Sequence, residues 1–345
     1  MKGKSDEVET RKLRRALLRW YTRAKRDLPW RRTRDPYRIW VSEVMLQQTR
    51  VAAVIPYYER FLERFPNVEA LAAATESDLL AAWSGLGYYR RERNLQKAAR
   101  QIVAEGYFPQ QFEKIRALPG VGDYTAAAIA CIAFGQPHAA VDGNVLRVLS
   151  RLTNDDGDIG SNGTKRRLAG LAQRLVVGEA PGKFNQALME LGATVCVPRR
   201  PNCELCPWRD YCEGCNAGRQ EQLPIKRKRV SARFVERSLL VVRKNGKVLL
   251  WRRPVDSARL AGFWELPEPE QAHGARIVRR AGSFRHSISN HNYLCHVLVA
   301  ALDRAPKGCS WLREEALKDA PLSTTVRKAL RLLRDEQLFQ HVNSR

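Results

Sequence analysis

Leu118-Pro119-Gly120-Val121-Gly122 is the stretch of this 345-residue chain that decides its fold. It lies between two segments whose apolar residues recur at helical spacing. Its glycines let the backbone turn tightly and point amide groups outward, where they can hold a phosphate. A glycine-rich connector between helices is a weak signal on its own, so the sequence around it determines how it is interpreted.

Two further features follow this stretch. The first is Val141-Asp142-Gly143-Asn144-Val145. The second is a set of four cysteines separated by six, two and five residues: Cys196, Cys203, Cys206 and Cys212. Four thiolates at such spacing can bind zinc or hold an iron–sulfur cluster. Zinc sites more often come as two well-separated Cys-x-x-Cys pairs, and this loop has one, so the spacing favours iron–sulfur over zinc and over idle thiols.

The remaining cysteines have less distinctive surroundings. Cys131, Cys295 and Cys309 lie in apolar segments and are expected to be buried in the core. Cys215 follows the cysteine loop closely, and we do not assign it as a ligand. The basic N-terminus is interrupted by acidic residues and no apolar stretch follows it, so we expect no secretion signal and a reducing compartment, in which disulfides are rare.

The glycine-rich stretch, the Asp142 segment and the cysteine loop together resemble the endonuclease III superfamily of helix-hairpin-helix DNA glycosylases. The resemblance implies a [4Fe–4S] cluster held by the four cysteines and a catalytic role for Asp142. Considered alone, Asp142 is typical of a helix N-cap. The two roles are compatible, because a carboxylate that caps a helix stays ionised and is held rigidly.

Tyr124, the second residue after the last glycine of the hairpin, bears on the reaction. In the bifunctional members of the superfamily this position is a lysine that forms a Schiff base with the sugar. A tyrosine has no amine from which an imine could form. The resemblance therefore implies a monofunctional glycosylase, which removes a base without cutting the strand.

Residues 40–49, with the sequence WVSEVMLQQT, closely resemble the signature of the adenine glycosylases, the MutY family. Glu43 lies here among apolar neighbours, so partial burial would raise its pKa and let it hold a proton near neutral pH. The resemblance implies that Glu43 protonates adenine at N7 and later activates water, while Asp142 stabilises the oxocarbenium-like sugar. Tyr124 would assist, and Asn144 would lie near the reacting sugar. Outside this signature, a solvated helix face or an ion pair would be the simpler interpretation of Glu43.

The same resemblance assigns residues to the flipped base and to the DNA. The implied adenine pocket is lined by Arg26, Leu28, Trp30, Arg31, Val51 and Gln186. For Trp30, core packing is nearly as good an interpretation. The implied DNA contacts are Gln48, Thr49, Leu86 and Tyr88 beside the lesion, and Gly120, Val121, Gly122, Arg199 and Arg200 at the phosphates. For the two arginines the alternative is ordinary surface charge.

The sequence changes character near residue 220. Residues 9–219 are expected to form an almost entirely helical catalytic region, composed of a six-helix-barrel module at about 29–130 and an iron–sulfur cluster module at about 9–28 and 131–219. A basic linker follows at 220–235 and a smaller domain at 236–340. The fold class is therefore multidomain, with an all-α region followed by an α+β domain.

The smaller domain has its own signals. The expected elements are strands at 238–242, 247–251 and 292–302, a hairpin turn at Asn245-Gly246, and a terminal helix at 322–337. The domain resembles the Nudix fold, most clearly at residues 262–267, GFWELP. The acidic metal-binding helix of Nudix hydrolases is missing from residues 268–283, so we expect no pyrophosphatase activity.

In the adenine glycosylase family this domain recognises 8-oxoguanine opposite the adenine through a Phe-Ser-His loop. The matching residues here are Ile288-Ser289-Asn290, followed by His291. The resemblance therefore assigns 8-oxoguanine recognition to Ser289, Asn290 and His291, with the serine hydroxyl bonding to N7–H or O8. The family's Phe and His are not retained in place, and a loop serine is by itself usually a turn residue.

Lys and Arg number 60 against 36 Asp and Glu, which gives a net charge of +24. Such an excess predicts a polyanionic partner, since neutralising phosphates releases counterions, although it would also serve as a solubilising surface. We expect double-stranded DNA with adenine opposite 8-oxoguanine or guanine, no membrane, a monomer, and a cytoplasmic location, nucleoid-associated in a bacterium. The alternatives are an endonuclease III-like glycosylase and AP lyase for pyrimidine lesions, a non-catalytic DNA-binding scaffold and a Nudix hydrolase.

Overall fold

The computed structural model describes residues 2–227, 233–254, 257, 260, 262–288, 291–318 and 320–342. Ser289 and Asn290, two of the residues assigned to 8-oxoguanine, lie outside the described residues, as does part of the expected linker. The chain divides into two compact units, Met1–Ala74 with Arg93–Lys228 and Thr75–Glu92 with Arg229–Arg345. We call the first the helical unit and the second the sheet unit.

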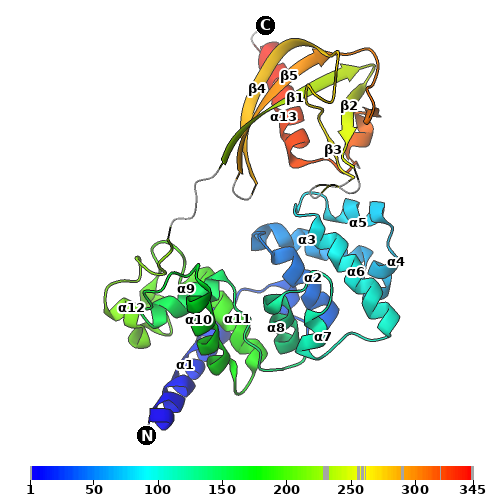
Figure 1. Ribbon diagram of the computed structural model, residues 1–345. Coiled ribbons are helices and arrows are strands. Elements are labelled where there is room, and N and C mark those ends of the chain that lie inside the picture. The colour runs from blue at the N-terminus through cyan, green and yellow to red at the C-terminus, as the bar shows by residue number, and fades with distance from the viewer. Residues whose placement is uncertain are drawn as a thin grey trace. The chain divides into compact units, whose positions relative to one another are not determined.

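Helices form the regular structure of the chain up to residue 216, as the apolar spacing predicts (Figure 1). Several begin at a side chain that accepts a hydrogen bond from the first turn, as at Asn67, Thr75 and Ser161. None of the described helices is long and apolar enough to cross a membrane. The elements are α1 (Lys2–Ala24), η1 (Pro29–Arg31), α2 (Pro36–Leu46), α3 (Val51–Arg64), α4 (Val68–Ala73), α5 (Glu76–Trp83), α6 (Arg90–Glu105), α7 (Phe112–Arg116), α8 (Asp123–Ile132), α9 (Gly143–Leu152), α10 (Asn162–Val176), α11 (Pro181–Thr194), η2 (Cys203–Leu205), η3 (Arg209–Tyr211) and α12 (Glu213–Asn216).

The glycine-rich stretch forms the turn between α7 and α8, as predicted. Val121 donates its backbone N–H to the carbonyl of Leu118 at 3.1 Å, and Gly122 is the N-cap of α8. Gly120 has a φ of 77°, and a Cβ at this position would lie 2.6 Å from the Cβ of Asn94. The left-handed backbone of the turn requires glycine here, and the close approach of Asn94 on α6 leaves no space for a side chain.

A core around α1, α9, α10 and α11 supports the start of α9. Leu17, Leu149 and Phe184 are fully buried in it. α11 packs against α1, α8 and α9, so it joins segments that precede and follow the glycine-rich turn. Gly192 permits this close packing, because a Cβ there would lie 3.0 Å from the Cβ of Asn144. The first turn of α9 is therefore held close to α11.

A mixed six-stranded sheet forms the centre of the sheet unit, in the order β3-β2-β1-β5-β4, with β6 paired to β2 (Figure 1). β1 and β5 run parallel, and the other paired strands are antiparallel. Along β1, Leu239 and Val241 face the core that α13 covers, whereas Leu240 and Val242 belong to a core on the other face. The elements are β1 (Arg233–Lys244), β2 (Lys247–Arg252), β3 (Trp264–Glu265), β4 (Arg276–Ile288), β5 (His291–Ala301), β6 (Cys309–Arg313), η4 (Glu315–Lys318) and α13 (Thr324–Val342).

The expected strands and terminal helix are confirmed, with bounds that differ by a few residues. Asn245 and Gly246 make the turn between β1 and β2, with positive φ values of 49° and 67° that suit a two-residue hairpin. β4 is a strand that the sequence analysis did not predict. Its sequence, RIVRRAGSFRHSI, contains four arginines, which hide the apolar alternation expected of a half-buried strand.

The first part of the expected linker packs on the helical unit. Leu223 is 2% exposed, and its carbonyl accepts a hydrogen bond from Nε of Arg151 at 3.0 Å. The backbone N–H of Ile159 donates to the carbonyl of Ile225 at 2.9 Å. The density of charge in this segment indicated a linker, whereas its apolar residues anchor it to α9 and to the loop after α9.

Candidate active site and cysteine pocket

A pocket of about 860 Å³ in the helical unit collects the residues that the sequence assigned to catalysis and to adenine. Its walls come from the segment before α2, from α2 itself, and from α8, α9 and α11. The predicted residues that line it are Arg26, Leu28, Trp30, Arg31, Glu43, Thr49, Val51, Tyr124, Asp142, Asn144 and Gln186. Other lining residues were not predicted: Ile39, Ser42, Leu46, Ile132, Met189, Glu190 and Ala193.

Glu43 lies on α2 and is 6% exposed. Burial disfavours its ionised form and raises its pKa to about 7, an effect that a hydrogen bond from Tyr124 partly offsets and the nearby Asp142 reinforces. Oε2 of Glu43 is buried and has no hydrogen-bond partner among the described residues. Near neutral pH this carboxyl group is therefore partly protonated, with one oxygen available to a molecule in the pocket.

Tyr124 lies at the start of α8, directly after the glycine-rich turn. Its hydroxyl hydrogen-bonds to Glu43 and lies 3.7 Å from Sδ of Met189. Burial, together with the neighbouring Glu43 and Asp142, raises the pKa of Tyr124 well above its ordinary value. The phenol therefore stays neutral and can serve only as a hydrogen-bonding group at physiological pH.

Asp142 caps the N-terminus of α9, as predicted. Its Oδ1 accepts the backbone N–H of Val145 at 2.7 Å, and its Oδ2 accepts from Nδ2 of Asn144 at 2.7 Å. The capping position also places the carboxylate at the positive end of the helix dipole. Both oxygens are thus held in one orientation at the edge of the pocket.

Hydrogen bonds continue from Asp142 to the cysteine loop. Oδ1 of Asn144 accepts from Nη2 of Arg147 at 2.9 Å, and Nε of Arg147 donates to the carbonyl of Cys196 at 2.9 Å. Arg147 also donates to the carbonyl of Gly192 on α11 at 2.8 Å. The first turn of α9 is therefore tied both to α11 and to the first cysteine of the loop.

Glu190 is the main pocket residue that sequence reasoning missed. It is fully buried on α11 and accepts hydrogen bonds from Nη2 of Arg26 and Nη2 of Arg31, each at 2.7 Å. Burial alone would raise the pKa of Glu190, but these hydrogen bonds outweigh it and lower the pKa to about 2. A signal was available, because Glu190 follows Gln186 by one helical turn in an otherwise apolar stretch, where a charge must be paired.

Gln186 is oriented by Tyr21, a buried residue of α1. The Tyr21 hydroxyl donates to Oε1 of Gln186 at 2.9 Å. The guanidinium of Arg31 lies over the Tyr21 ring, 5.5 Å from its centroid. With Oε1 engaged, the Nε2 amide is the part of Gln186 that remains for a base in the pocket.

Trp30 fits both of the roles that the sequence allowed. It lines the pocket, and it is 7% exposed and packs edge-to-face on Tyr58, with ring centroids 5.4 Å apart. Leu28, 5% exposed, lines the same wall. Apolar side chains such as Leu28 and Trp30 therefore share the pocket with many polar groups, so it can both pack against a planar organic ligand and hydrogen-bond to it.

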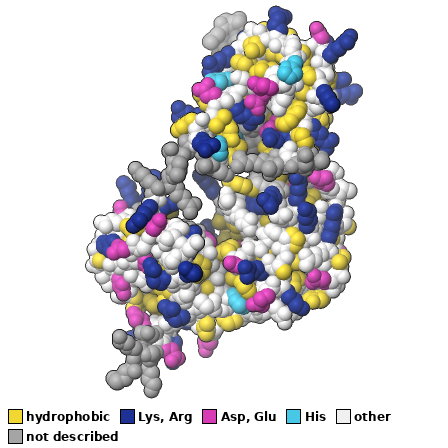
Figure 2. All heavy atoms as spheres, viewed as in Figure 1, with side chains coloured by type: hydrophobic (Ala, Val, Ile, Leu, Met, Phe, Trp, Pro, Cys, Tyr) yellow, Lys and Arg dark blue, Asp and Glu magenta, His cyan; other side chains and the backbone are white. Residues whose placement is uncertain are grey.

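The residues assigned to DNA lie outside this pocket, except Thr49. Gln48 and Tyr88 are exposed and have positive φ values of 56° and 50°, a conformation that costs energy in residues other than glycine. Leu86 and Val121 are buried, 7% and 8% exposed, so contacts there would use the backbone. The remaining residues are exposed: Gly120, Gly122, Arg199 and Arg200. Figure 2 shows Lys and Arg side chains spread over the visible face of both units.

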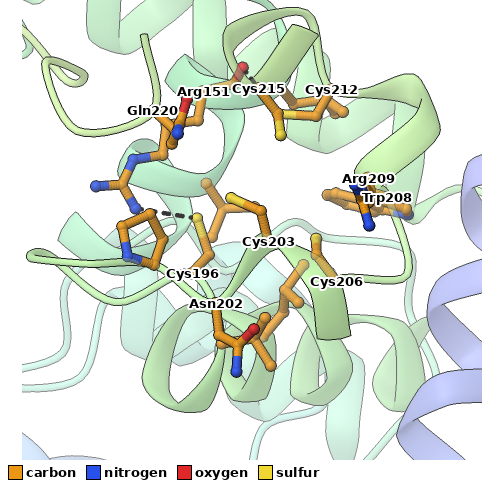
Figure 3. Close-up of a pocket in the computed structure, with 15 residues that line it drawn as sticks. Arg151, Cys196, Asn202, Cys203, Cys206, Trp208, Arg209, Cys212, Cys215 and Gln220 are labelled. Atoms are coloured by element: carbon orange, nitrogen blue, oxygen red, sulfur yellow. Dashed lines mark hydrogen bonds between the residues drawn. The ribbon is translucent and has the colours of Figure 1, made fainter. Parts of the chain in front are cut away.

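A second cavity in the helical unit, of about 410 Å³, is lined by cysteines (Figure 3). They are the four predicted ligands, Cys196, Cys203, Cys206 and Cys212, together with Cys215. Arg151 is 2% exposed and donates to Sγ of Cys196 at 3.3 Å and to the carbonyls of Val197 and Pro198 at 2.8 and 3.1 Å. The buried Trp208 donates its ring N–H to the carbonyl of Leu13 at 2.9 Å, which fastens the loop to α1.

The surroundings of these cysteines suit thiolate ligands. The backbone of Trp208 next to Cys206 and of Gly214 next to Cys212 favours the thiolate forms and lowers the pKa of each thiol, against the effect of burial. Burial raises the pKa of Cys206 to about 12, so it gives up its proton only to a metal that replaces it. The thiols of the four predicted ligands line one cavity, which fits a cluster whose irons each take one thiolate.

The other cysteines lie elsewhere. Cys131, Cys295 and Cys309 are buried, 1%, 0% and 9% exposed. Cys131 belongs to the core of the helical unit, and the other two belong to the two cores of the sheet unit. The prediction that these three are core thiols is confirmed.

His291 is the described member of the residues assigned to 8-oxoguanine. It begins β5, paired in register with Ile288 at the end of β4, and stacks on Tyr293 with ring centroids 5.9 Å apart. Nδ1 of His291 is buried and has no hydrogen-bond partner among the residues that the structure describes. His291 therefore lies next to the tip of the β4–β5 hairpin with one ring nitrogen still able to bond.

Two family models match the helical unit. One is the HhH-GPD superfamily of base excision DNA repair proteins, which matches residues 41–174. The other is the iron–sulfur binding domain of endonuclease III, which matches residues 196–212 and so spans the four predicted ligands. The expected [4Fe–4S] cofactor is thereby confirmed.

The individual proteins to which the chain is similar are also DNA glycosylases. The chain is 37% identical over 412 residues to the adenine DNA glycosylase of Mus musculus, covering 96% of this chain and 80% of that protein. It is 36% identical over 414 residues to the adenine DNA glycosylase of Homo sapiens, covering 96% and 76%. Among solved structures, a thermostable thymine-DNA glycosylase is similar, with a TM-score of 0.55 and 31% identity over 62% of this chain and 99% of that one. The fold class predicted for the helical region is confirmed.

Proposed function

This chain belongs to the family of adenine DNA glycosylases of base excision repair, and we propose that it removes adenine mispaired with 8-oxoguanine or guanine. The observation that carries the proposed chemistry is the pair of carboxyl groups in one pocket. Glu43 has a pKa of about 7 and an oxygen without a partner among the described residues, whereas both oxygens of Asp142 accept hydrogen bonds. Two carboxyl groups in contrasting surroundings are what acid-assisted glycosidic cleavage requires.

Glu43 is the proposed general acid. Neutral adenine is a poor leaving group, so Glu43 gives a proton to N7 of the flipped base, and the electrons of the C1′–N9 bond move onto the adenine as it leaves. The carboxylate that results then takes a proton from water, whose oxygen adds to C1′. A pKa of about 7 suits both steps, because the group both donates and accepts a proton near neutral pH.

Asp142 is the proposed stabiliser of the positive charge that develops on the sugar. Its two hydrogen bonds hold the carboxylate still while the bond breaks, so no reorganisation of the site is required. Tyr124 bonds to Glu43 and orients it, and Asn144 keeps Oδ2 of Asp142 in place. The pocket would thus hold the acid on one wall and the stabilising charge on another.

The remaining pocket residues would select the base. Gln186, with Oε1 bonded to Tyr21, offers its Nε2 amide to a ring nitrogen of adenine. Glu190 keeps Arg26 and Arg31 in place, and Trp30 packs against the base. Outside the pocket, the strained backbones of Gln48 and Tyr88 support the proposal that these exposed side chains enter the base stack. Exposed Arg199 and Arg200 would contact phosphates.

Tyr124 in place of a lysine supports base removal without strand cleavage. The test uses duplexes with adenine opposite 8-oxoguanine, adenine opposite guanine, and an oxidised thymine. We expect abasic sites from both adenine duplexes that break only after alkali. Cleavage of the thymine lesion without alkali would favour the alternative, an endonuclease III-like glycosylase and lyase.

We propose that Ser289, Asn290 and His291 recognise 8-oxoguanine. The support is His291, whose Nδ1 is buried and unpartnered among the described residues, beside Ser289 and Asn290 in the sequence. We expect His291→Ala to reduce the preference for adenine opposite 8-oxoguanine over adenine opposite guanine in single-turnover assays. His273→Ala, an exposed histidine of the same unit, is the control. An unchanged preference in His291→Ala would remove this residue from the assignment.

We propose further that the protein acts on DNA as a monomer in the cytoplasm, associated with the nucleoid if the source is bacterial. The helical unit contains a complete pocket of its own, which supports action as a single chain. Sedimentation of the protein with and without a short mispaired duplex measures this. A 2:1 complex as the active species would contradict it.

A further inference from the structure

Cys215 is the fifth cysteine that lines the cysteine cavity, and it is not one of the four predicted ligands. It lies on α12, the short helix that begins directly after Cys212, and its backbone N–H donates to the carbonyl of Cys212 at 3.1 Å. Its side chain lines the same cavity as the four ligands (Figure 3). The chain therefore directs five thiols to a cofactor that takes four.

Cys215 interacts with two of the ligands. Its backbone lies next to Cys212, and its side chain interacts with the side chain of Cys203, which begins η2 on a separate part of the loop. Cys203 and Cys215 are twelve positions apart in the sequence, so the loop between them brings them together by folding back. The Cys215 sulfur thus lies beside the position from which Cys203 would bind its iron.

α12 is held in this position by close packing. A Cβ on Gly214 would lie 2.5 Å from the carbonyl oxygen of Arg151, so α12 packs directly on the end of α9. The same carbonyl accepts the thiol of Cys212 at 3.2 Å. This close packing, which only glycine allows at position 214, holds the neighbouring Cys215 at the wall of the cavity.

We propose that Cys215 is a reserve ligand of the iron–sulfur cluster, able to take the iron position of Cys203 when Cys203 is lost. The exchange needs no electron transfer. The Cys215 thiol releases its proton to water, and its sulfur forms the iron bond that Cys203 would otherwise make. The inference rests on the family's cluster and is independent of the adenine assignment, since its tests measure iron and thiols and not base release.

The first test compares iron and sulfide content in four variants: Cys203→Ala, Cys215→Ala, the double variant, and Cys206→Ala as the matched control. Alanine is used because it cannot bind iron. We expect Cys215→Ala and Cys203→Ala each to keep most of the cluster, and the double variant to lose it. Cys206→Ala should lose its cluster although Cys215 is present. Loss of the cluster from Cys203→Ala alone would overturn the proposal.

The second test maps the free thiols. Holoprotein is treated with iodoacetamide, digested and analysed by mass spectrometry. Cys215 should be alkylated in the unchanged chain, where Cys203 is the ligand, and protected in Cys203→Ala. Alkylation of Cys215 in a Cys203→Ala protein that still carries its cluster would also overturn the proposal. Circular dichroism of each variant shows whether a loss of iron reflects a loss of fold.

Discussion

The pocket that contains Glu43 and the cysteine cavity lie in the same helical unit and share α9, yet their buried charged groups differ in hydrogen bonding. In the first pocket, Glu43 is buried with one oxygen left without a partner among the described residues. In the cysteine cavity, the buried Arg151 uses its donors on a sulfur and on backbone carbonyls. The contrast concerns the buried charged groups: the carboxyl group of Glu43 keeps an oxygen open to a ligand, whereas the guanidinium of Arg151 is engaged by the protein. The neutral amide of Gln220 in the cysteine cavity also leaves its Oε1 without a partner among the described residues.

The largest effect on the rate of adenine release is expected from Glu43→Gln. The substitution keeps the size of the side chain but removes the transferable proton, so single-turnover release of adenine should fall by about 10²–10⁴-fold. Binding of the mispaired duplex should be retained. The control is Ser42→Ala, a neighbouring pocket residue whose hydroxyl bonds only within α2 to the carbonyl of Ile39. Near-normal release by Glu43→Gln would exclude this residue as the acid.

The corresponding change in the cysteine cavity is Arg151→Met. It leaves the buried carbonyl of Leu223 and the part-buried carbonyls of Val197 and Pro198 without their donor. A buried acceptor left without its partner costs about 1–3 kcal/mol of folding free energy, so we expect a loss in this range or somewhat above it. Urea unfolding of the holoprotein measures the cost, and iron content should fall in parallel. Arg200→Met, an exposed arginine of the same loop, should leave both unchanged.

Adenine release and folding stability should both depend on pH through Glu43. Since Glu43 must be protonated to act and its pKa is about 7, release of adenine should fall about tenfold per pH unit above that value. The ionisation of Glu43 also changes the free energy of unfolding. Because the folded pKa is raised, Glu43 contributes stability that is fully present below its ordinary pKa and is lost as the pH rises through about 7. Single-turnover rates and urea midpoints from pH 5 to 9 would show both, and Glu43→Gln should flatten both curves.

The smallest effect is expected from Tyr21→Phe. This change removes the hydroxyl that orients Gln186 and keeps the ring under Arg31. A single hydrogen bond of this kind is worth about 1 kcal/mol, so adenine release should weaken roughly fivefold. The discrimination between adenine and other bases should fall with it. A loss of thermal stability without any change in base selection would assign Tyr21 to packing alone.

Sequence reasoning was most successful where one short segment carries the whole signal. The glycine-rich turn fixes its own geometry through Gly120, and the cap of α9 requires only Asp142 and the residues after it. The five consecutive residues of the turn and the spacing of the cysteines are visible without knowledge of the fold. Motifs of this kind could be assigned because their physical requirements are local.

It failed where a residue's role depends on a distant partner. Glu190 meets Arg26 and Arg31 across about 160 positions, and Arg151 meets the loop after Cys196 across about 45. The apolar stretch around Glu190 indicates that its charge must be paired, but nothing near either residue identifies the partner. β4 was missed for a different reason, since an arginine-rich strand lacks the apolar alternation on which strand prediction depends.

The length of α9 limits the insertions and deletions that this helix can accept. Asp142 caps its first turn, and Arg151 lies in its last turn beside Cys196. The ten residues of α9 therefore set the distance between the pocket that contains Glu43 and the cysteine cavity. Each residue of an α-helix advances about 1.5 Å and rotates about 100°. An insertion or deletion of one residue would therefore turn one site away from its partners while the other stayed in place. Every residue of α9 from Val145 to Leu152 is buried, so its composition is constrained by packing as well as its residue count by the two sites.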